Sequence, residues 1–234
     1  MEKNLKGIPV LFENSFCLVL NKPSGLSVQG GEGVKTSLDS ILSELVEPRP
    51  FLVHRLDRDT SGLILAAKTR EAAAAFSALF SGGARSLSDK GRALIKRYLG
   101  VCSGIPVPDS GLIDLELDIR GKRKKSETSY KCQKSGTACG VSLSLLELEL
   151  GTGRMHQIRR HLARSGHPLL GDDKYGDFSL NKKFRKTAGL KTLLLHASRL
   201  VIPPAPGLIP EGLDISAALP GHFTSFLELL TYSK

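Results

Sequence analysis

A strongly charged segment lies between two apolar runs, residues 51–53 and 63–67. The nine residues between the runs read His-Arg-Leu-Asp-Arg-Asp-Thr-Ser-Gly. Charge beside a low-dielectric core is costly unless it is paired. The segment therefore has to fold as a turn between two core strands, with its charges paired or in use. Asp59 is well placed to cap the Thr-Ser-Gly bend, so Asp57 is the charge that still needs a partner.

The distribution of basic residues indicates a polyanionic partner. The net charge of +10 comes from 33 lysines and arginines against 23 acidic residues. The excess is concentrated in residues 122–125, 154–164 and 182–186. Any one of these segments could be solvated surface, but three of them together predict that the chain binds nucleic acid.

Length, hydrophobicity and cysteine content indicate a globular protein of the cytoplasm. The 234 residues, 41% of them hydrophobic, are enough for a full core. No apolar run approaches a membrane span, and the N-terminus has no signal-peptide core. The four cysteines contain no Cys-x-x-Cys pair. Free thiols are expected, and they should be buried at Cys17 and Cys102.

The spacing of apolar residues predicts more strands than helices. Helices are expected at residues 36–46, 71–80, 156–165 and 223–230, and strands at 10–12, 17–20, 63–68, 93–101, 112–119, 141–150 and 192–202. A change of phase within 141–150 indicates a β-bulge there, and residues 122–126 are expected to form a charged loop. Because consecutive strands in the middle of the chain lack intervening helices, the order favours an α+β fold with a mixed, largely antiparallel central sheet and flanking helices and loops.

Common catalytic and metal-binding patterns are absent from the sequence. Asp57-x-Asp59 begins like an EF-hand calcium loop, but Lys68 stands where that loop needs a bidentate glutamate. His156 and His161 are five residues apart, which on a helix points them in different directions and argues against zinc. The chain has no Walker A loop, no Gly-x-Gly-x-x-Gly and no Gly-x-Ser-x-Gly. No metal site is therefore expected.

Five motifs, in order along the chain, carry a resemblance to a known family. They are Leu-Asn-Lys-Pro-Ser-Gly-Leu at 20–26, the charged segment at 54–62, Lys-Arg-Tyr-Leu at 96–99, residues 151–168 with Gly-Thr-Gly-Arg-Met-His-Gln-Ile-Arg at their start, and Leu-His-Ala at 195–197. The set resembles the RNA pseudouridine synthases of the ribosomal large-subunit and tRNA branch, over nearly the whole chain. The chain departs from the family pattern at Gly100, Met155 and Pro204.

The resemblance implies a fold and a reaction. It implies a single catalytic domain over residues 1–234, with two subdomains as the alternative, and an active-site cleft across the sheet. The small N-terminal RNA-binding domain of many relatives is expected to be absent, because the first matched strand begins near residue 10. The reaction would isomerise a uridine in structured RNA, either rRNA or tRNA, to pseudouridine. It needs no cofactor and no nucleotide, and the enzyme is expected to be a monomer that does not associate with membranes.

The resemblance also implies roles for individual residues. Asp57 would be the essential carboxylate, Arg159 the partner that keeps it ionised, and Tyr98 the ring that stacks on the uracil and assists loss of the C5 proton. Arg55 matches the position that fills the gap left by a flipped-out uridine. Other RNA contacts are expected from Arg154, His156, Lys122, Arg123, Lys124 and Lys125. Whether Asp57 attacks the sugar, adds to the base or abstracts a ribose proton stays open.

Two other functions stay open at this point. A non-catalytic RNA-binding or ribosome-assembly protein could keep the same fold, although it would have no physical reason to maintain a buried charge pair. Hydrolysis of the glycosidic bond, with release of uracil, would use the same carboxylate. Pseudouridine formation and uracil release are the two measurements that separate these functions from the isomerase.

Overall fold

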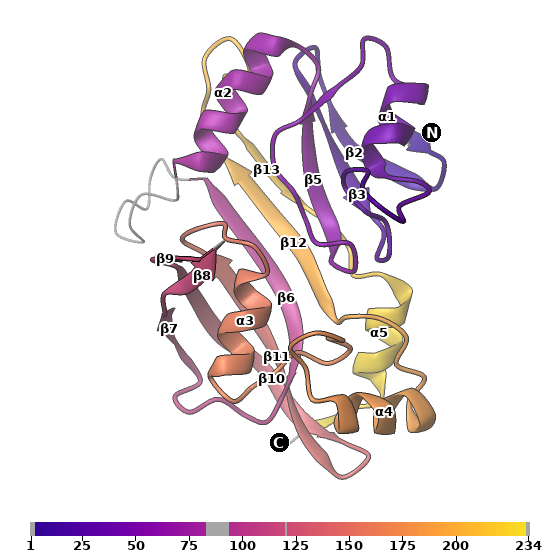
Figure 1. Cartoon of the computed structure of the whole chain (residues 1–234), viewed down its shortest axis with the longest axis vertical. Helices are drawn as coiled ribbons and strands as arrows, with labels where there is room; N and C mark the ends of the chain where they lie inside the picture. Colours follow the sequence, from indigo (N-terminus) through magenta and orange to yellow (C-terminus); the bar gives the residue numbers. More distant parts are fainter. Residues whose placement is uncertain (1–2, 83–93, 120, 233–234) are drawn as a thin grey trace. The chain divides into compact units, whose positions relative to one another are not determined.

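The structure, a computed structural model, describes residues 3–82, 94–119 and 121–232 (Figure 1). The chain divides into two compact units. The first comprises Met1–Lys96 and Ala197–Ala218, and the second comprises Arg97–His196 and Leu219–Lys234. The boundaries fall within β6 (Ile95–Ser103), within β12 (Leu195–Ile202) and after β13 (Leu213–Ser216).

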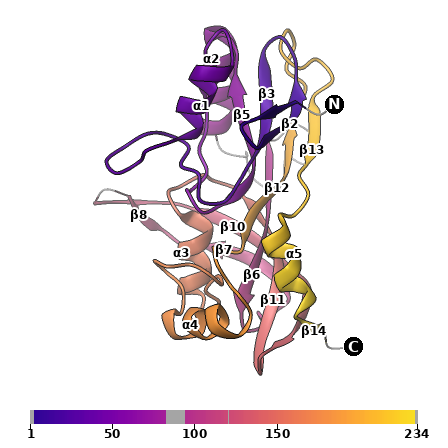
Figure 2. The same ribbon diagram turned by 90° about the vertical axis from the view of Figure 1, so that its right-hand side faces the viewer.

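The first unit is an antiparallel sheet with two helices. Its strands follow the order β1 (Asn4–Leu5), β2 (Ile8–Glu13), β3 (Cys17–Lys22), β5 (Ser61–Ala67), β12, with β4 (Phe51–Leu52) beside β5 and β13 beside β12. Helices α1 (Leu38–Leu45) and α2 (Arg70–Ser81) lie on one side of β3 and β5 (Figure 2). Every residue of β5 is buried, which explains why its sequence from Leu63 to Ala67 is continuously apolar rather than alternating.

Gly62, the last residue of the charged segment, is required by the close approach of β12. Its φ is +109°, and a Cβ at this position would lie 2.3 Å from the carbonyl oxygen of Ala197. No side chain fits in that space, and L-residues rarely adopt that backbone conformation. The end of the charged segment and Ala197 of β12 are therefore in close backbone contact.

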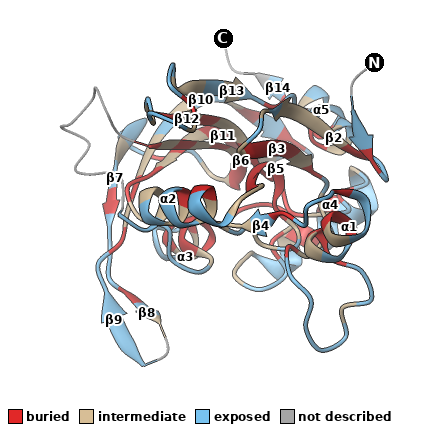
Figure 3. Cartoon of the chain, turned by 90° about the horizontal axis from the view of Figure 1, so that it is seen from above, coloured by how far each residue is buried: buried red, intermediate tan, exposed pale blue. Residues whose placement is uncertain are grey.

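The second unit is built on three long antiparallel strands. They are β6, β11 (Val141–Leu150) and β10 (Glu127–Ala138), and β10 also pairs with β7 (Ser110–Asp114) and β14 (Thr231–Tyr232). A separate hairpin of β8 (Leu117–Ile119) and β9 (Lys122–Lys124) extends away from these strands (Figure 3). The helices of this unit are α3 (Gln157–Arg164), α4 (Phe178–Thr187) and α5 (Gly221–Glu228). The rings of Phe184 on α4 and Phe226 on α5 meet edge to face, with centroids 5.5 Å apart, in the buried core.

The fold class predicted from the sequence, α+β with a largely antiparallel sheet, is confirmed by these pairings. Several details of the prediction were wrong. Residues 112–119 form parts of two strands, β7 and β8, rather than one. The expected charged loop at 122–126 contains β9. The bulge lies on the partner strand, where Gln133 is the extra residue of β10 opposite Leu145 and Leu146.

The cysteines follow the expectation where the structure describes their burial. Cys17 and Cys102 are buried, and all four thiols are free. Within the described ranges, no helix is both long and apolar enough to cross a membrane.

Candidate active site

The turn after β3 holds the loop that carries Asp57, within the first unit. The ammonium group of Lys22, a fully buried residue, donates to the carbonyl oxygens of Pro23, Leu26 and Arg58 at 3.0, 2.8 and 2.9 Å. The backbone N–H of Gly25 donates to the same Arg58 carbonyl at 2.9 Å. The first two sequence motifs are therefore joined by hydrogen bonds, and the buried side chain of Lys22 makes one of them.

Lys22 belongs to the first sequence motif, which assigned it no role of its own. Burial lowers its pKa to about 8, and the nearby carboxylates of Asp59 and Asp57 act in the opposite direction. At neutral pH the side chain is therefore mostly charged. It interacts electrostatically with the two aspartates of the loop, Asp57 and Asp59. Its signals in the sequence were its place in the motif at 20–26 and its position just after the apolar run Cys-Leu-Val-Leu at 17–20.

His54 anchors the start of the same loop to β5. Its Nε2 accepts a hydrogen bond from the backbone N–H of Leu65 at 2.9 Å. Its ring is stacked on Phe80 with centroids 4.0 Å apart and an interplanar angle of 9°. Burial, with a smaller contribution from the charge of Lys96, lowers the pKa of His54 to about 3. The imidazole is therefore neutral, and its task is to fix the loop.

Arg55 and Asp57 follow this anchor and belong to the first unit. Arg55 is exposed and Asp57 is partly buried. The backbone carbonyl of Asp57 accepts the N–H of Thr60 at 3.2 Å, which closes the turn. Asp59, the expected cap of that bend, pairs instead with the adjacent Arg58, whose Nε lies 3.2 Å from its Oδ1.

Arg159 is held by a second carboxylate of its own unit. Its Nε and Nη2 each donate to Asp172 at 2.8 Å. The side chains are 6% and 1% exposed. Burial by itself would raise the pKa of Asp172, but the guanidinium and the backbone N–H groups of Tyr175 and Lys174 outweigh it and lower the pKa. The pair is therefore charged, and its two parallel hydrogen bonds fix the orientation of Arg159.

Tyr175 completes this cluster, and no sequence motif had assigned it a role. The guanidinium carbon of Arg159 lies 5.3 Å from the centroid of the Tyr175 ring. The tyrosine hydroxyl shares a 3.0 Å hydrogen bond with Nδ1 of His156. His156 has a left-handed backbone, with φ of +52°, immediately before α3. The expected RNA-binding histidine thus lies against Tyr175, which makes both side chains part of the Arg159 environment.

Gln157 fixes the loop that precedes α3. Its Oε1 accepts from the Thr152 hydroxyl at 2.7 Å and from the backbone N–H of Arg154 at 3.0 Å. Its Nε2 donates to the Glu127 carbonyl at 2.8 Å and to the Thr128 hydroxyl at 3.0 Å. Because a buried amide makes all four bonds, the motif Gly-Thr-Gly-Arg-Met-His-Gln has one defined shape, with Arg154 and Met155 exposed.

The other expected site residues of the second unit lie on strands, except Lys125, which follows β9. Tyr98 is 8% exposed on β6, where it pairs with Leu148 of β11. Lys122, Arg123 and Lys124 are all exposed on β9. Lys125 lies 3.1 Å from Glu127 and 3.9 Å from Asp114. The second unit thus holds an aromatic residue, a fixed arginine and a basic hairpin.

The first unit holds Arg55 and Asp57, and the second holds the remaining expected site residues: Tyr98, Lys122, Arg123, Lys124, Lys125, Arg154, His156 and Arg159. Across residues 3–82, 94–119 and 121–232, histidine, cysteine and acidic side chains form no group of three or more that could hold a metal ion.

Comparison with known proteins gives consistent results. Residues 17–164 match the family model described as RNA pseudouridylate synthase. The ribosomal large subunit pseudouridine synthase C of Haemophilus influenzae is 34% identical over 96% of this chain and 69% of its own length. Its counterpart from Rickettsia prowazekii is 33% identical over 92% of this chain and 69% of its own length. Among solved structures, human RNA pseudouridylate synthase domain containing 4 is similar with a TM-score of 0.75 and 26% identity, over 96% of this chain and 94% of that one.

Proposed function

This chain belongs to the RNA pseudouridylate synthase family, and we propose that it converts uridines of ribosomal RNA to pseudouridine with Asp57, Tyr98 and Arg159 as its catalytic residues. Ribosomal RNA is the substrate in the names of the bacterial relatives, and transfer RNA is the alternative to be tested beside it. We further propose a monomeric enzyme of the cytoplasm.

The reaction is an isomerisation of a nucleotide already in the RNA chain. The bond from ribose C1′ to N1 of the uracil breaks, the base turns while it is held, and a bond forms from C1′ to C5. The proton on C5 is lost and N1 gains one, so that nothing is oxidised and no group is imported. The residues needed are a carboxylate, a surface that holds the detached base, and a group that moves the C5 proton.

We propose that Asp57 supplies the carboxylate, whether it attacks the sugar, adds to the base or abstracts a ribose proton. Each route needs the ionised form at neutral pH, and a nearby cation favours that form. Arg159 is proposed to provide that cation. The observation that supports this most is the bidentate ion pair with Asp172, because it fixes the orientation of the guanidinium in a charged form.

Tyr98 is proposed to stack on the uracil. An aromatic face holds a base without requiring one in-plane orientation, which the turning uracil needs. Its hydroxyl is proposed to assist removal of the C5 proton. Arg55 is proposed to occupy the gap left in the RNA when the uridine flips out, and this offsets a stacking loss of a few kcal/mol.

The basic residues are proposed to hold RNA phosphates. Lys122, Arg123 and Lys124 are exposed on a hairpin that extends from its unit, which suits contact with a large polyanion. Lys125 and Arg154 are proposed to add to this contact, and His156 through its position beside Tyr175. Such contacts provide affinity and register without choosing a sequence.

The test is a carbodiimide primer-extension assay for pseudouridine on large-subunit ribosomal RNA and on transfer RNA. Wild-type protein should form pseudouridine, and Asp57→Asn should form none while it still binds RNA and unfolds cooperatively. Asp59→Asn is the matched control, because it removes the same charge from the same loop, and it should remain active. Measurable turnover by Asp57→Asn would remove Asp57 from the chemical step. RNA binding without pseudouridine in either RNA would favour the non-catalytic function, and release of uracil would favour hydrolysis.

A further inference from the structure

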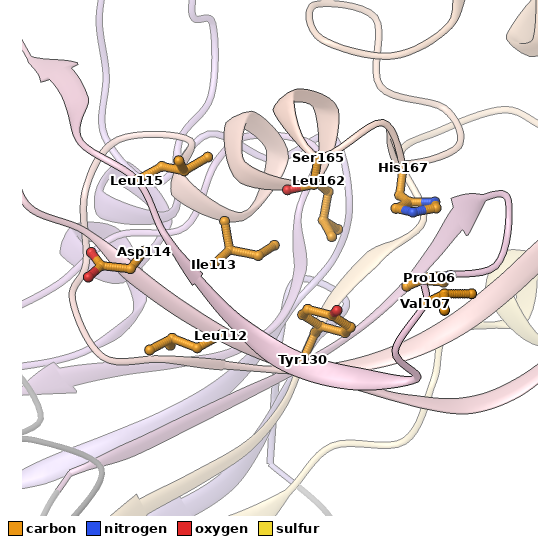
Figure 4. Close-up of a pocket in the computed structure, with 10 residues that line it drawn as sticks. All are labelled: Pro106, Val107, Leu112, Ile113, Asp114, Leu115, Tyr130, Leu162, Ser165 and His167. Carbon is orange, nitrogen blue, oxygen red and sulfur yellow. The ribbon is translucent and has the colours of Figure 1, made fainter.

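The second unit contains a half-open cavity of about 390 Å³, at the small end of the range of roughly 300–1,000 Å³ that ligand pockets occupy (Figure 4). It lies between β7, the last turn of α3 and the segment that follows β6. Val107, Leu112, Leu115 and Leu162 contribute apolar side chains to its walls, which also carry polar groups. None of the residues that line it belongs to the proposed catalytic set.

Tyr130 provides the cavity with an aromatic surface. It pairs with Gly111 across β10 and β7, and its ring lies over that glycine, where a Cβ would come within 2.9 Å of the hydroxyl and 3.0 Å of Cε1. The hydroxyl donates to the carbonyl oxygen of Pro108 at 3.2 Å. The ring is therefore held at both its face and its tip. In Figure 4 it lies on the opposite side of the cavity from Leu162.

Polar groups stand at the rim. Ser165 and His167 lie at the end of α3 and beyond it, and Asp114 lies across from them on β7 (Figure 4). The imidazole of His167 is fixed, because its Nδ1 donates to the carbonyl oxygen of Ser103 at 3.0 Å. Apolar side chains, an aromatic ring and polar groups at the edge match the two faces and the hydrogen-bonding edge of a nucleobase.

The surroundings of the cavity favour a nucleotide over an apolar protein side chain. Val107 is 90% exposed and Leu112 is 51% exposed, which marks an apolar surface available to a partner. Two cations lie on the helix that supplies Leu162 to the cavity wall: Arg160 and Arg164 of α3 donate to the carbonyl oxygens of Asp118 and Glu116, respectively. Lys125 lies 3.9 Å from Asp114 at the rim. A pocket with apolar side chains and an aromatic ring, lined in part by a helix that also carries these two arginines, suits a partner with a flat base and an anionic backbone.

We propose that this cavity binds one unpaired nucleobase of the substrate RNA, distinct from the uridine that is isomerised. The identity of the RNA rests on the proposed function. The bound base stacks on Tyr130, its polar edge meets Ser165 or His167, and the adjoining phosphates meet Arg160 and Arg164. This second binding site gives the enzyme a way to select a uridine by an unpaired base at a set place in the RNA.

The first test is photo-crosslinking of the whole protein to unstructured 12-nucleotide oligoribonucleotides that contain 4-thiouridine. Crosslinks should map to peptides that contain Tyr130 or His167. Tyr130→Leu should weaken oligonucleotide binding about tenfold, since the stacking of one base on an aromatic ring corresponds to a roughly 5- to 150-fold change in affinity. Tyr130→Phe keeps the ring and should bind like wild type. Melting temperatures of both variants separate a binding defect from a folding defect.

A second pair of variants leaves the Tyr130 ring and its packing on Gly111 unchanged. Leu112→Gln changes the exposed wall of the cavity, and Leu229→Gln is its matched control, because Leu229 is 47% exposed at the end of α5. Only Leu112→Gln should weaken binding and raise the KM for structured RNA, with kcat unchanged. If both variants bind the oligonucleotide equally and the crosslinks map elsewhere, the proposal is overturned. The cavity would then be better explained as a site for an apolar side chain of a protein partner. Crosslinking needs no turnover, so a wild-type protein that forms no pseudouridine but crosslinks at Tyr130 would contradict the proposed function and support this site.

Discussion

Arg159 and Asp172 form a bidentate ion pair with both hydrogen bonds at 2.8 Å, and both side chains are almost completely buried. Asp172 is tied in turn to the backbone N–H groups of Lys174 and Tyr175 at 2.9 Å. The arginine is thus fixed by a carboxylate that is itself fixed. A buried pair of this kind contributes little net stability, so its value lies in the orientation that it gives the guanidinium.

The first prediction concerns Asp172→Asn. Removing one partner leaves a buried guanidinium uncompensated, which we expect to lower the free energy of unfolding by about 3 kcal/mol. We also expect kcat to fall by at least tenfold with a smaller change in KM, because the residue acts through the position of Arg159. Urea unfolding and steady-state kinetics measure the two effects. Asp173→Asn is the control, since that carboxylate is 64% exposed and 3.8 Å from Arg159, and we expect little effect on either quantity.

The second prediction concerns His54 and acid. The pKa of His54 is about 3 in the folded protein and 6.5 for the free side chain, so the unfolded chain binds more protons between these values. The stability that depends on neutral His54 is complete above pH 6.5 and is lost as the pH falls toward 3, by up to about 1.4 kcal/mol per pH unit. The free-energy difference between wild type and His54→Gln should therefore shrink as the pH falls. Urea unfolding at pH 7.5, 6 and 5 measures it, and a difference that stays constant would contradict a neutral imidazole at His54.

Local sequence patterns predicted the strands and helices whose apolar residues are regularly spaced, such as β5 and α1. They missed β10 because its residues are mostly polar and its burial depends on neighbours on both sides, β11 and β7. They missed α4 because three of its residues in a row, Asn181 among them, are polar or basic. Asn181 is nevertheless buried, and it bonds the backbone of Gly171 and Asp172.

The candidate site shows the same limit. The motif resemblance identified Asp57, Tyr98 and Arg159 as residues to test, but nothing local marks Asp172 as the partner of an arginine 13 residues earlier. The buried role of Lys22 was also hidden, because its three acceptors are backbone carbonyls, which every residue has. Side chains that act on backbone, or on residues brought together by the fold, leave no pattern in a single sequence.

The third prediction concerns the basic hairpin. Replacing Lys122, Arg123 and Lys124 by glutamine should weaken RNA binding. The plot of the logarithm of the association constant against the logarithm of the salt concentration should also become less steep, by about 0.7–0.9 for each phosphate that is no longer neutralised. Fluorescence anisotropy at several salt concentrations measures the slope. The control replaces Lys3, Lys6 and Lys35, which removes the same charge from the first unit. If both triple variants change the slope equally, β9 has no special role in binding and only the total charge of the protein matters.

The last prediction separates base flipping from chemistry through Arg55. If this side chain fills the gap left by the uridine, Arg55→Ala should slow the reaction on folded RNA, because the cost of unstacking, a few kcal/mol, loses part of its compensation. The penalty should shrink on a short unstructured oligonucleotide, in which the uridine is already exposed. Asp57→Asn should be inactive on both substrates, since it lacks the reacting carboxylate.

Arg58→Ala is the matched control, because Arg58 is an exposed arginine of the same loop that pairs with Asp59. This variant should react at similar rates on both RNAs. Single-turnover rates on the two substrates decide the matter. An equal loss on both with Arg55→Ala would place the arginine in phosphate binding or in the chemical step, because neither of those roles depends on how firmly the uridine was stacked.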